Sequence, residues 1–266
     1  MTTQRNHPLV VLPLITAVSL FMLLLRCARL LLVLVLPLLA SCSSLYFPPP
    51  PQVPLLTQEG EWSGTLQTNF SQNTSVQGAY SPINHLGVMG SVSFLHTDKK
   101  KRAEDHDFGE VGLGYYTRIR DTRVLELYGG VGLGKTKRVE RTPDEGVTRT
   151  LEGNLTKYFV QANYTSKDHK SFHVLGRDWP VNYGTALRVS YMQLDKFRID
   201  GQAAAPEDNV FLEPITYTRI ELVGPVQFQL ISGSNFGLRH RKFLKAANSV
   251  FQFGLIVNVG GQQGRK

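Results

Sequence analysis

Three groups of residues in this 266-residue chain have types and spacings that chemistry could use. The sequence GGVGLGKT, from Gly129 to Thr136, satisfies the P-loop pattern G-x-x-x-x-G-K-[ST], in which backbone amides and a lysine bind phosphate. His169 and His173 have the four-residue spacing of metal ligands on one face of a helix. A third group lies on one polar stretch and has the residue types of acid-base catalysis: His96, Asp98, Asp105, His106 and Asp107.

The surrounding sequence argues against all three sites. A P-loop needs a helix directly after the motif, because phosphate binds at a helix N-terminus. Residues 137–146 instead contain Pro143 and Gly146 and have no apolar repeat of 3.6 residues. Glycine at every second position fits a strand with one small face, so we interpret the match as spurious. The histidine groups lack helical patterning and fit solvated turns, so we predict no metal, no nucleotide, no cofactor and no catalytic site.

Cys42 is the residue whose context points most clearly to a modification. The tetrapeptide LASC at 39–42 closes a run of leucine and valine. A cysteine after an apolar region and a small-residue cleavage site resembles a bacterial lipobox, whose thiol receives a diacylglycerol. We therefore predict a signal peptide over residues 1–41 and a covalent diacylglycerol on Cys42.

The predicted leader is longer than the roughly 15 to 30 residues of a usual signal peptide. Arg26 and Arg29 divide its apolar residues into two blocks, and a start at Met22 would place charge before the apolar region as expected. The alternative is an uncleaved membrane helix over residues 8–25, near the minimum of about 17 apolar residues.

The remaining 225 residues carry 26 basic and 21 acidic side chains, and Cys42 is their one cysteine. No intramolecular disulfide is therefore expected. The basic bursts lie between apolar stretches, which favours solvated loops near anionic lipid over nucleic-acid binding. Prolines at 48–51 and 54 favour an extended polyproline II segment, so residues 42–59 are predicted to be the lipid anchor and a short stiff spacer.

From residue 60 onward the chain alternates between apolar or aromatic residues and small or polar ones, with a period of two. Most alternating segments approach the roughly 9 to 11 residues of a tilted transmembrane strand. They lie at 61–70, 74–82, 86–96, 107–117, 124–137, 152–165, 182–195, 212–223, 226–234 and 249–259. We predict an all-β fold over residues 60–266, a closed antiparallel transmembrane β-barrel with an up-and-down meander of about ten strands, eight to twelve at the extremes.

Charges within these segments should point into the lumen, because a basic residue facing lipid at mid-depth costs about 2 to 4 kcal/mol. The predicted lumen charges are Glu110, Glu126, Arg188, Arg219 and Glu221. We expect Arg188 to pair with Glu221. Polar stretches such as 97–106, 138–151 and 196–211 are predicted to be external loops, and 166–181 is an unusually long periplasmic connection.

Two stretches, at 54–61 and 78–88, carry a family resemblance: PLLTQEGE and GAYSPINHLGV. They resemble the opening of small outer-membrane β-barrel lipoproteins of the Bacteroidota type, a family with no assigned activity. The residues after Cys42 lack the acidic run that resembles a surface-export signal in that phylum, so the resemblance implies acyl chains on the periplasmic side.

Taken together, these patterns predict an outer-membrane barrel, anchored by lipid at Cys42, with a structural or surface-binding role and unknown protein partners. A narrow diffusion pore is the alternative, since about ten strands leave little open space. A second alternative is a hydrolase with a rim site that uses His106 and Asp107.

Overall fold

The structure is a computed structural model that describes residues 44–119, 123–142, 144, 146–174, 176–245 and 250–260, without the side chains of 166–170 and 172. The chain divides into two units, Met1–Ser41 and Cys42–Lys266, and every described residue belongs to the second. Cys42 and the predicted signal peptide lie outside the described residues. None of the helices in the described part is long and apolar enough to cross a membrane.

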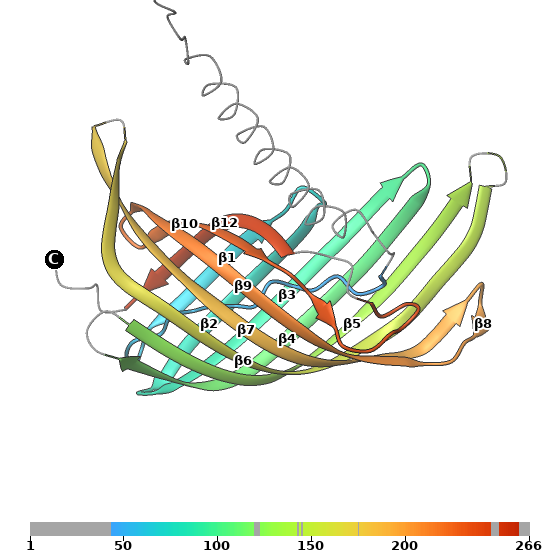
Figure 1. The fold of residues 1–266 in the computed structure, drawn as a ribbon, viewed down its shortest axis with the longest axis horizontal. Coiled ribbons are helices and arrows are strands. Elements are labelled where there is room, and N and C mark those ends of the chain that lie inside the picture. The colour runs from blue at the N-terminus through green and yellow to red at the C-terminus, as the bar shows by residue number, and fades with distance from the viewer. Residues whose placement is uncertain are drawn as a thin grey trace, which may run out of the picture. The chain divides into compact units, whose positions relative to one another are not determined.

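The described residues form one antiparallel sheet of twelve strands that closes on itself (Figure 1). The strands are β1 (Trp62–Thr68), β2 (Asn73–Ile83), β3 (Leu86–Lys99), β4 (Arg102–Ile119), β5 (Arg123–Thr142), β6 (Gly146–Val174), β7 (Arg177–Ile199), β8 (Gln202–Ala203), β9 (Glu207–Val223), β10 (Val226–Gly233), β11 (Phe236–Gly237) and β12 (Val250–Val259). Strands β8 and β11 have two residues each, and the other ten make the wall. Pairing of β7 with β9 and of β12 with β1 closes a ten-stranded meander, which confirms the predicted fold class.

All ten predicted segments are strands, but several are longer than predicted. Strands β3 and β4 pair as far as Lys99 and Arg102, so most of the predicted loop 97–106 is ladder. The same holds for 138–151 in β5 and β6. The predicted connection 166–181 is a hairpin made by the ends of β6 and β7, which projects from one end of the barrel (Figure 1). These predictions were wrong because backbone hydrogen bonds between neighbouring strands continue through polar residues and need no apolar face.

The two ends of the barrel differ in their connections. One end, the turn end, carries the short links at 84–85 and 224–225 and the last described residue, 260. The other, the loop end, carries the links at 200–206 and 234–249, which contain β8 and β11. Strand β1 starts at the turn end, where the amide of Gly60 donates to the carbonyl of Ser81.

The outer face is apolar over a band of membrane thickness. Outward residues of β5 include Leu127, Val131 and Leu133, which are 49%, 43% and 67% exposed. The stretch from Leu125 to Leu133 covers nine residues, or about 23 Å at a rise of ~3.3 Å and a tilt of ~40°. That height matches the lipid-facing band of about 25 Å in outer-membrane barrels. Charged side chains follow at once, beginning with Lys135.

The inner face combines small residues with large rings. A Cβ atom at Gly130 would lie 2.4 Å from the Cζ of Phe159, and one at Gly134 would lie 2.2 Å from the Cδ2 of Phe108. Glycine at these inward positions of β5 lets aromatic rings from β4 and β6 lie across the wall. This packing explains the alternating glycines that produced the P-loop match.

Candidate functional site

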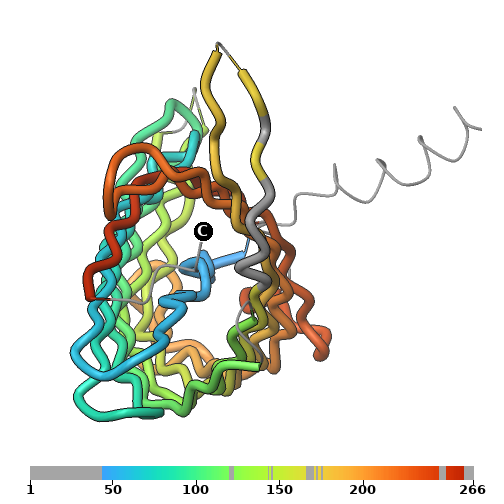
Figure 2. Tube along the Cα trace, turned by 90° about the vertical axis from the view of Figure 1, so that its left-hand side faces the viewer, coloured from blue at the N-terminus to red at the C-terminus, as the bar shows by residue number. Residues whose placement is uncertain are grey.

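Residues 44–57, the first part of the described chain, lie inside the barrel (Figures 1 and 2), and the exposed Glu59 and Gly60 follow at the turn end. Three strands on different sides of the wall bind their carbonyls: Gln77 donates to Pro50 at 2.8 Å, Gln161 donates to Gln52 at 2.6 Å, and Arg219 donates to Val53. An extended proline-rich segment makes no internal hydrogen bonds, so buried carbonyls need donors from the wall. The sequence predicted a lipid anchor and a short stiff spacer over residues 42–59, and the structure places residues 44–57 of this stretch, the lumen segment, in the interior.

The lumen segment runs from the loop end to the turn end. At its start, the amide of Leu45 donates to the carbonyl of Phe243 at 3.0 Å, and Arg138 donates to the carbonyl of Ser44. Phe243 belongs to the long connection at the loop end. At the far end, the amide of Leu56 donates to the Oε1 of Glu126 at 2.9 Å. The chain therefore passes through the whole barrel before β1 begins.

A buried charge network holds the loop-end half of the lumen segment. Lys157 Nζ donates to the Tyr46 hydroxyl at 2.8 Å and to Glu110 at 2.9 Å, and it lies 3.4 Å from Glu213. Tyr46 donates in turn to Glu213 at 2.9 Å. Arg188 donates to Glu110 at 2.8 Å, and its guanidinium lies 4.2 Å from the Phe159 ring. Two cations and two carboxylates thus balance, which is the condition for charges to remain buried.

A second pair of charges binds the turn-end half. Glu126 is fully buried and accepts hydrogen bonds from the Leu56 amide and from Asn163, both at 2.9 Å. Arg219 lies 1% exposed and donates to the Val53 carbonyl and to Gln229. In the described part of the chain neither group forms a salt bridge, and each is hydrogen-bonded to the backbone of the lumen segment instead. Removing the segment would therefore leave both charges without these partners.

The predicted lumen charges occupy two environments. The structure places Glu110, Glu126, Arg188 and Arg219 in the interior. Glu221 is half-buried near the turn end and accepts from Asn182 at 3.5 Å. The predicted pairing of Arg188 with Glu221 is wrong, because the β7–β9 register sets Arg188 opposite Glu213 and its guanidinium bonds Glu110.

Sequence reasoning missed Lys157, Glu213 and Tyr46. Glu213 could have been found, because it shares the inward parity of Tyr217 and Arg219 on β9. Lys157 lies between Tyr158 and Thr156 on a strand whose faces the sequence does not separate clearly. Tyr46 had no signal, since the segment that contains it shows no periodicity.

The chemistry-like motifs do not assemble into sites. Residues 129–136 lie in the middle of β5 and are paired with β4 and β6, so their backbone is engaged in the sheet and no helix follows. Asp107 is outward and bonds His96 at 3.0 Å, while the neighbouring His106 is buried beside Phe108. Alternation along β4 therefore separates His106 from Asp107 on opposite faces, which contradicts the proposed rim pair.

The remaining polar groups are also engaged elsewhere. Asp98 pairs with Arg141, and His173 is exposed and pairs with Asp178 at 2.9 Å. The side chain of His169 lies outside the described residues. In the described part of the chain, no group of three or more His, Cys, Asp or Glu residues could hold a metal ion.

The connection between β10 and β12 is hydrogen-bonded to β9 and to the start of the lumen segment. Glu207 accepts the amides of Phe243 and Leu244, each at 2.9 Å. Asp208 lies at the loop end of β9, beyond the apolar band, and bonds Arg239 and Arg241. Hydrogen bonds from Arg239 and Arg241 lower the pKa of Asp208 to about 2. The Asp208 carboxylate therefore stays charged at any physiological pH.

Comparisons with known proteins concern the fold alone. No protein-family profile matches the sequence, and no curated protein matches it. The translocator domain of the autotransporter NalP from Neisseria meningitidis is similar in structure, with 12% identity and a TM-score of 0.41 over 74% of this chain and 84% of that one. A chain of the FpvAI–pyocin S2 complex matches at 9% identity and a TM-score of 0.21, over 79% of this chain and 42% of that one. The described residues form an all-β, closed antiparallel barrel with a wall of ten strands.

Proposed function

We propose that this chain is an outer-membrane barrel whose lumen is closed by its own N-terminal segment, with a structural or surface-binding role and no catalytic site. The observation that carries the proposal is the passage of residues 44–57 through the interior, where a balanced charge network and wall donors bind them. A closed lumen is unsuited to the narrow diffusion pore that the sequence left as an alternative.

The membrane part of the proposal rests on the distribution of side chains. The apolar band faces outward, and the buried carboxylates, lysine and guanidinium groups face inward. A soluble barrel would have the reverse arrangement. This inverted distribution is the one that a lipid environment requires.

The direction of the lumen segment sets the side on which the predicted lipid would lie. Short turns face the periplasm in outer-membrane barrels, so the turn end is periplasmic and the loop end external. Ser44, the first described residue, lies at the loop end, and Cys42 is two residues away, at most about 7 Å. A diacylglycerol on Cys42 would therefore enter the external leaflet. The expectation of acyl chains on the periplasmic side does not fit this geometry, and the proposal replaces it.

Surface labelling of intact cells tests this arrangement. A short epitope inserted after Ser43 should bind antibody without permeabilisation, whereas the same epitope in the turn at Gly224 should bind only after the outer membrane is opened. The reverse result would place the loop end in the periplasm. Incorporation of labelled fatty acid, lost in Cys42→Ser, tests the lipid separately from the orientation.

Planar bilayer recording tests the closed lumen. Purified full-length protein should give no discrete conductance, because wall donors and buried charges fill the space around the lumen segment. Steady ohmic channels in the unaltered protein would contradict the closed barrel and restore the pore.

A further inference from the structure

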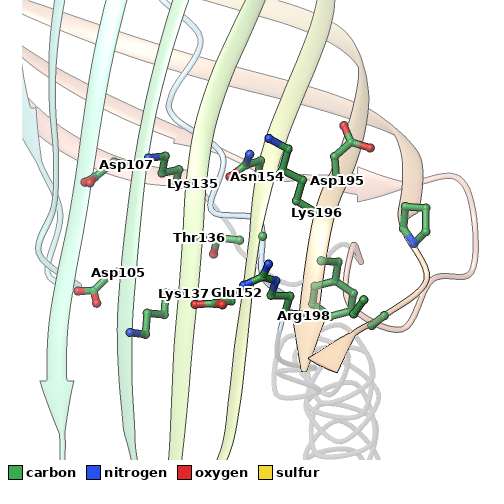
Figure 3. Close-up of a pocket in the computed structure, with 15 residues that line it drawn as sticks. Asp105, Asp107, Lys135, Thr136, Lys137, Glu152, Asn154, Asp195, Lys196 and Arg198 are labelled. Carbon is green, nitrogen blue, oxygen red and sulfur yellow. The ribbon is translucent and has the colours of Figure 1, made fainter. Parts of the chain in front are cut away.

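A hollow of about 670 Å³ lies on the outer wall at the loop end, across β4, β5, β6 and β7 (Figure 3). Two rows of charged side chains cross it. One row joins Asp105, Lys137, Glu152 and Arg198 in neighbouring strands. The next joins Asp107, Lys135, Asn154 and Asp195, with Lys196 beside Asp195 in the chain. The hollow thus begins where the apolar band ends, at the level of lipid headgroups.

A bulge in β7 shapes this hollow. The register between β6 and β7 shifts between Glu152 and Asn154, so that Lys196 and Phe197 face the single residue Gly153. Lys196 has a φ of 48°, which is uncommon for a residue with a side chain. Bulges at barrel rims re-aim side chains, and here Lys196 is exposed and lies next to Asn154 of β6 (Figure 3).

The cations around the hollow have no protein partner in the described part of the chain. Lys135, Lys137, Lys196 and Arg198 form none of the ion pairs or hydrogen bonds found there, although acidic residues flank them along the ladder. Two of those acids, Asp105 and Asp107, bond His96 instead, at 3.3 and 3.0 Å. Four uncommitted cations around one concave surface are suited to an anion with several acceptor oxygens.

An apolar groove of about 490 Å³ continues from the hollow toward the membrane. Val92, Phe94 and Leu133 line it, and it shares Asp107, Lys135 and Asn154 with the hollow. Phe94 and Leu133 are 43% and 67% exposed. Four cations and four carboxylates line the hollow, and the four cations without a side-chain partner, next to an apolar groove, match an amphiphile with a phosphorylated head and an acyl chain.

We propose that this composite surface binds a phosphate-bearing lipid of the leaflet at the loop end, with the phosphate among the four cations and an acyl chain in the groove. The proposal rests on the proposed function, because it needs the barrel to span a membrane.

Lipid titration of the full-length protein in a neutral detergent, read by native mass spectrometry, tests the site. Phosphatidic acid and diacylglycerol with identical chains differ only in the phosphate, and inorganic phosphate supplies the head alone. Wild-type protein should bind phosphatidic acid about tenfold or more tighter than diacylglycerol, the effect of at least one charge-assisted hydrogen bond. The triple variant Lys135→Gln, Lys137→Gln, Lys196→Gln should lose this preference.

Matched controls make each outcome decisive. Lys99→Gln, Lys100→Gln, Lys101→Gln removes the same charge from the β3–β4 turn at the same end and should keep the preference. Equal loss in both triple variants would overturn the proposal in favour of general electrostatic attraction.

Leu133→Ala should weaken phosphatidic acid binding, because Leu133 lines the apolar groove. Displacement of the lipid by millimolar inorganic phosphate would overturn the proposal, since it would show an anion site without a lipid. Flotation with lipid vesicles separates failure of the lipid site from failure of the proposed membrane barrel. Protein that floats with the vesicles but binds both lipids equally refutes the site and leaves the membrane barrel standing.

Discussion

Replacing Lys157 by methionine is the most informative perturbation of the lumen. The ammonium group is fully buried and contacts Tyr46, Glu110 and Glu213. Methionine keeps most of the apolar stem but leaves one cation, Arg188, against two carboxylates. Breaking a buried ion pair by removing one partner costs about 3 to 5 kcal/mol. For a chain of this size, that cost corresponds to a fall of roughly 6 to 20 °C in the midpoint of thermal unfolding.

Unfolding of the purified protein in detergent, followed by its heat-dependent gel mobility and tryptophan fluorescence, measures the shift. Adding Glu213→Gln to the lysine variant restores a balance of one cation and one carboxylate and should recover part of the loss. Lys135→Met removes an exposed lysine from the same barrel and should change the midpoint little. The reasoning fails if Lys157→Met unfolds at the wild-type temperature, or if the second substitution lowers the midpoint further.

The other predictions address the two faces of the wall. Gly130→Ala should destabilise the barrel by about 1 to 3 kcal/mol, since its Cβ would lie 2.3 Å from the Val111 carbonyl oxygen. Gly129→Ala should not, because the atom nearest to its Cβ would lie 3.9 Å away. Equal midpoints of thermal unfolding in the two variants would refute the packing. Val131→Arg should lower the free energy of unfolding in lipid vesicles by about 2 to 4 kcal/mol, because position 131 belongs to the outward apolar band. Leu238→Arg should change it little, because Leu238 is 65% exposed in the loop-end connection. Equal free energies of unfolding for the two variants would argue that the apolar band does not face lipid.

The wall could be predicted from the sequence because its strands alternate between an apolar outer face and a small or polar inner face. Each of the ten alternating segments corresponds to a strand, and Leu127, Val131 and Leu133 point outward as their pattern indicated. The extensions of β5, β6 and β7 could not be predicted in the same way. Beyond the bilayer both faces meet water, so the ladder continues through polar residues without any period.

The position of the lumen segment inside the barrel could not be predicted from the sequence, for a different reason. A proline-rich segment has the same extended backbone inside or outside a barrel, and nothing in residues 44–57 shows which donors will bind its carbonyls. The inward charges Glu110 and Arg188 were identifiable from alternation, but their partners depend on register and on a segment that enters from the loop end. Only the structure connects Lys157 to Tyr46, 111 residues away in sequence.

The presence of residues 44–57 in the lumen is the central claim, and chemical crosslinking within the folded protein tests it most directly. Gln161 on β6 bonds the carbonyl of Gln52 at 2.6 Å, so cysteines at these two positions should be joined by a short thiol crosslinker in protein extracted from outer membranes. A cysteine at Lys135, on the outer face of β5, should not be joined to one at Gln52. The account predicts a linked peptide pair for Gln52 and Gln161 alone. Free reaction of the Gln52 position with a water-soluble maleimide, and no linked pair, would contradict it.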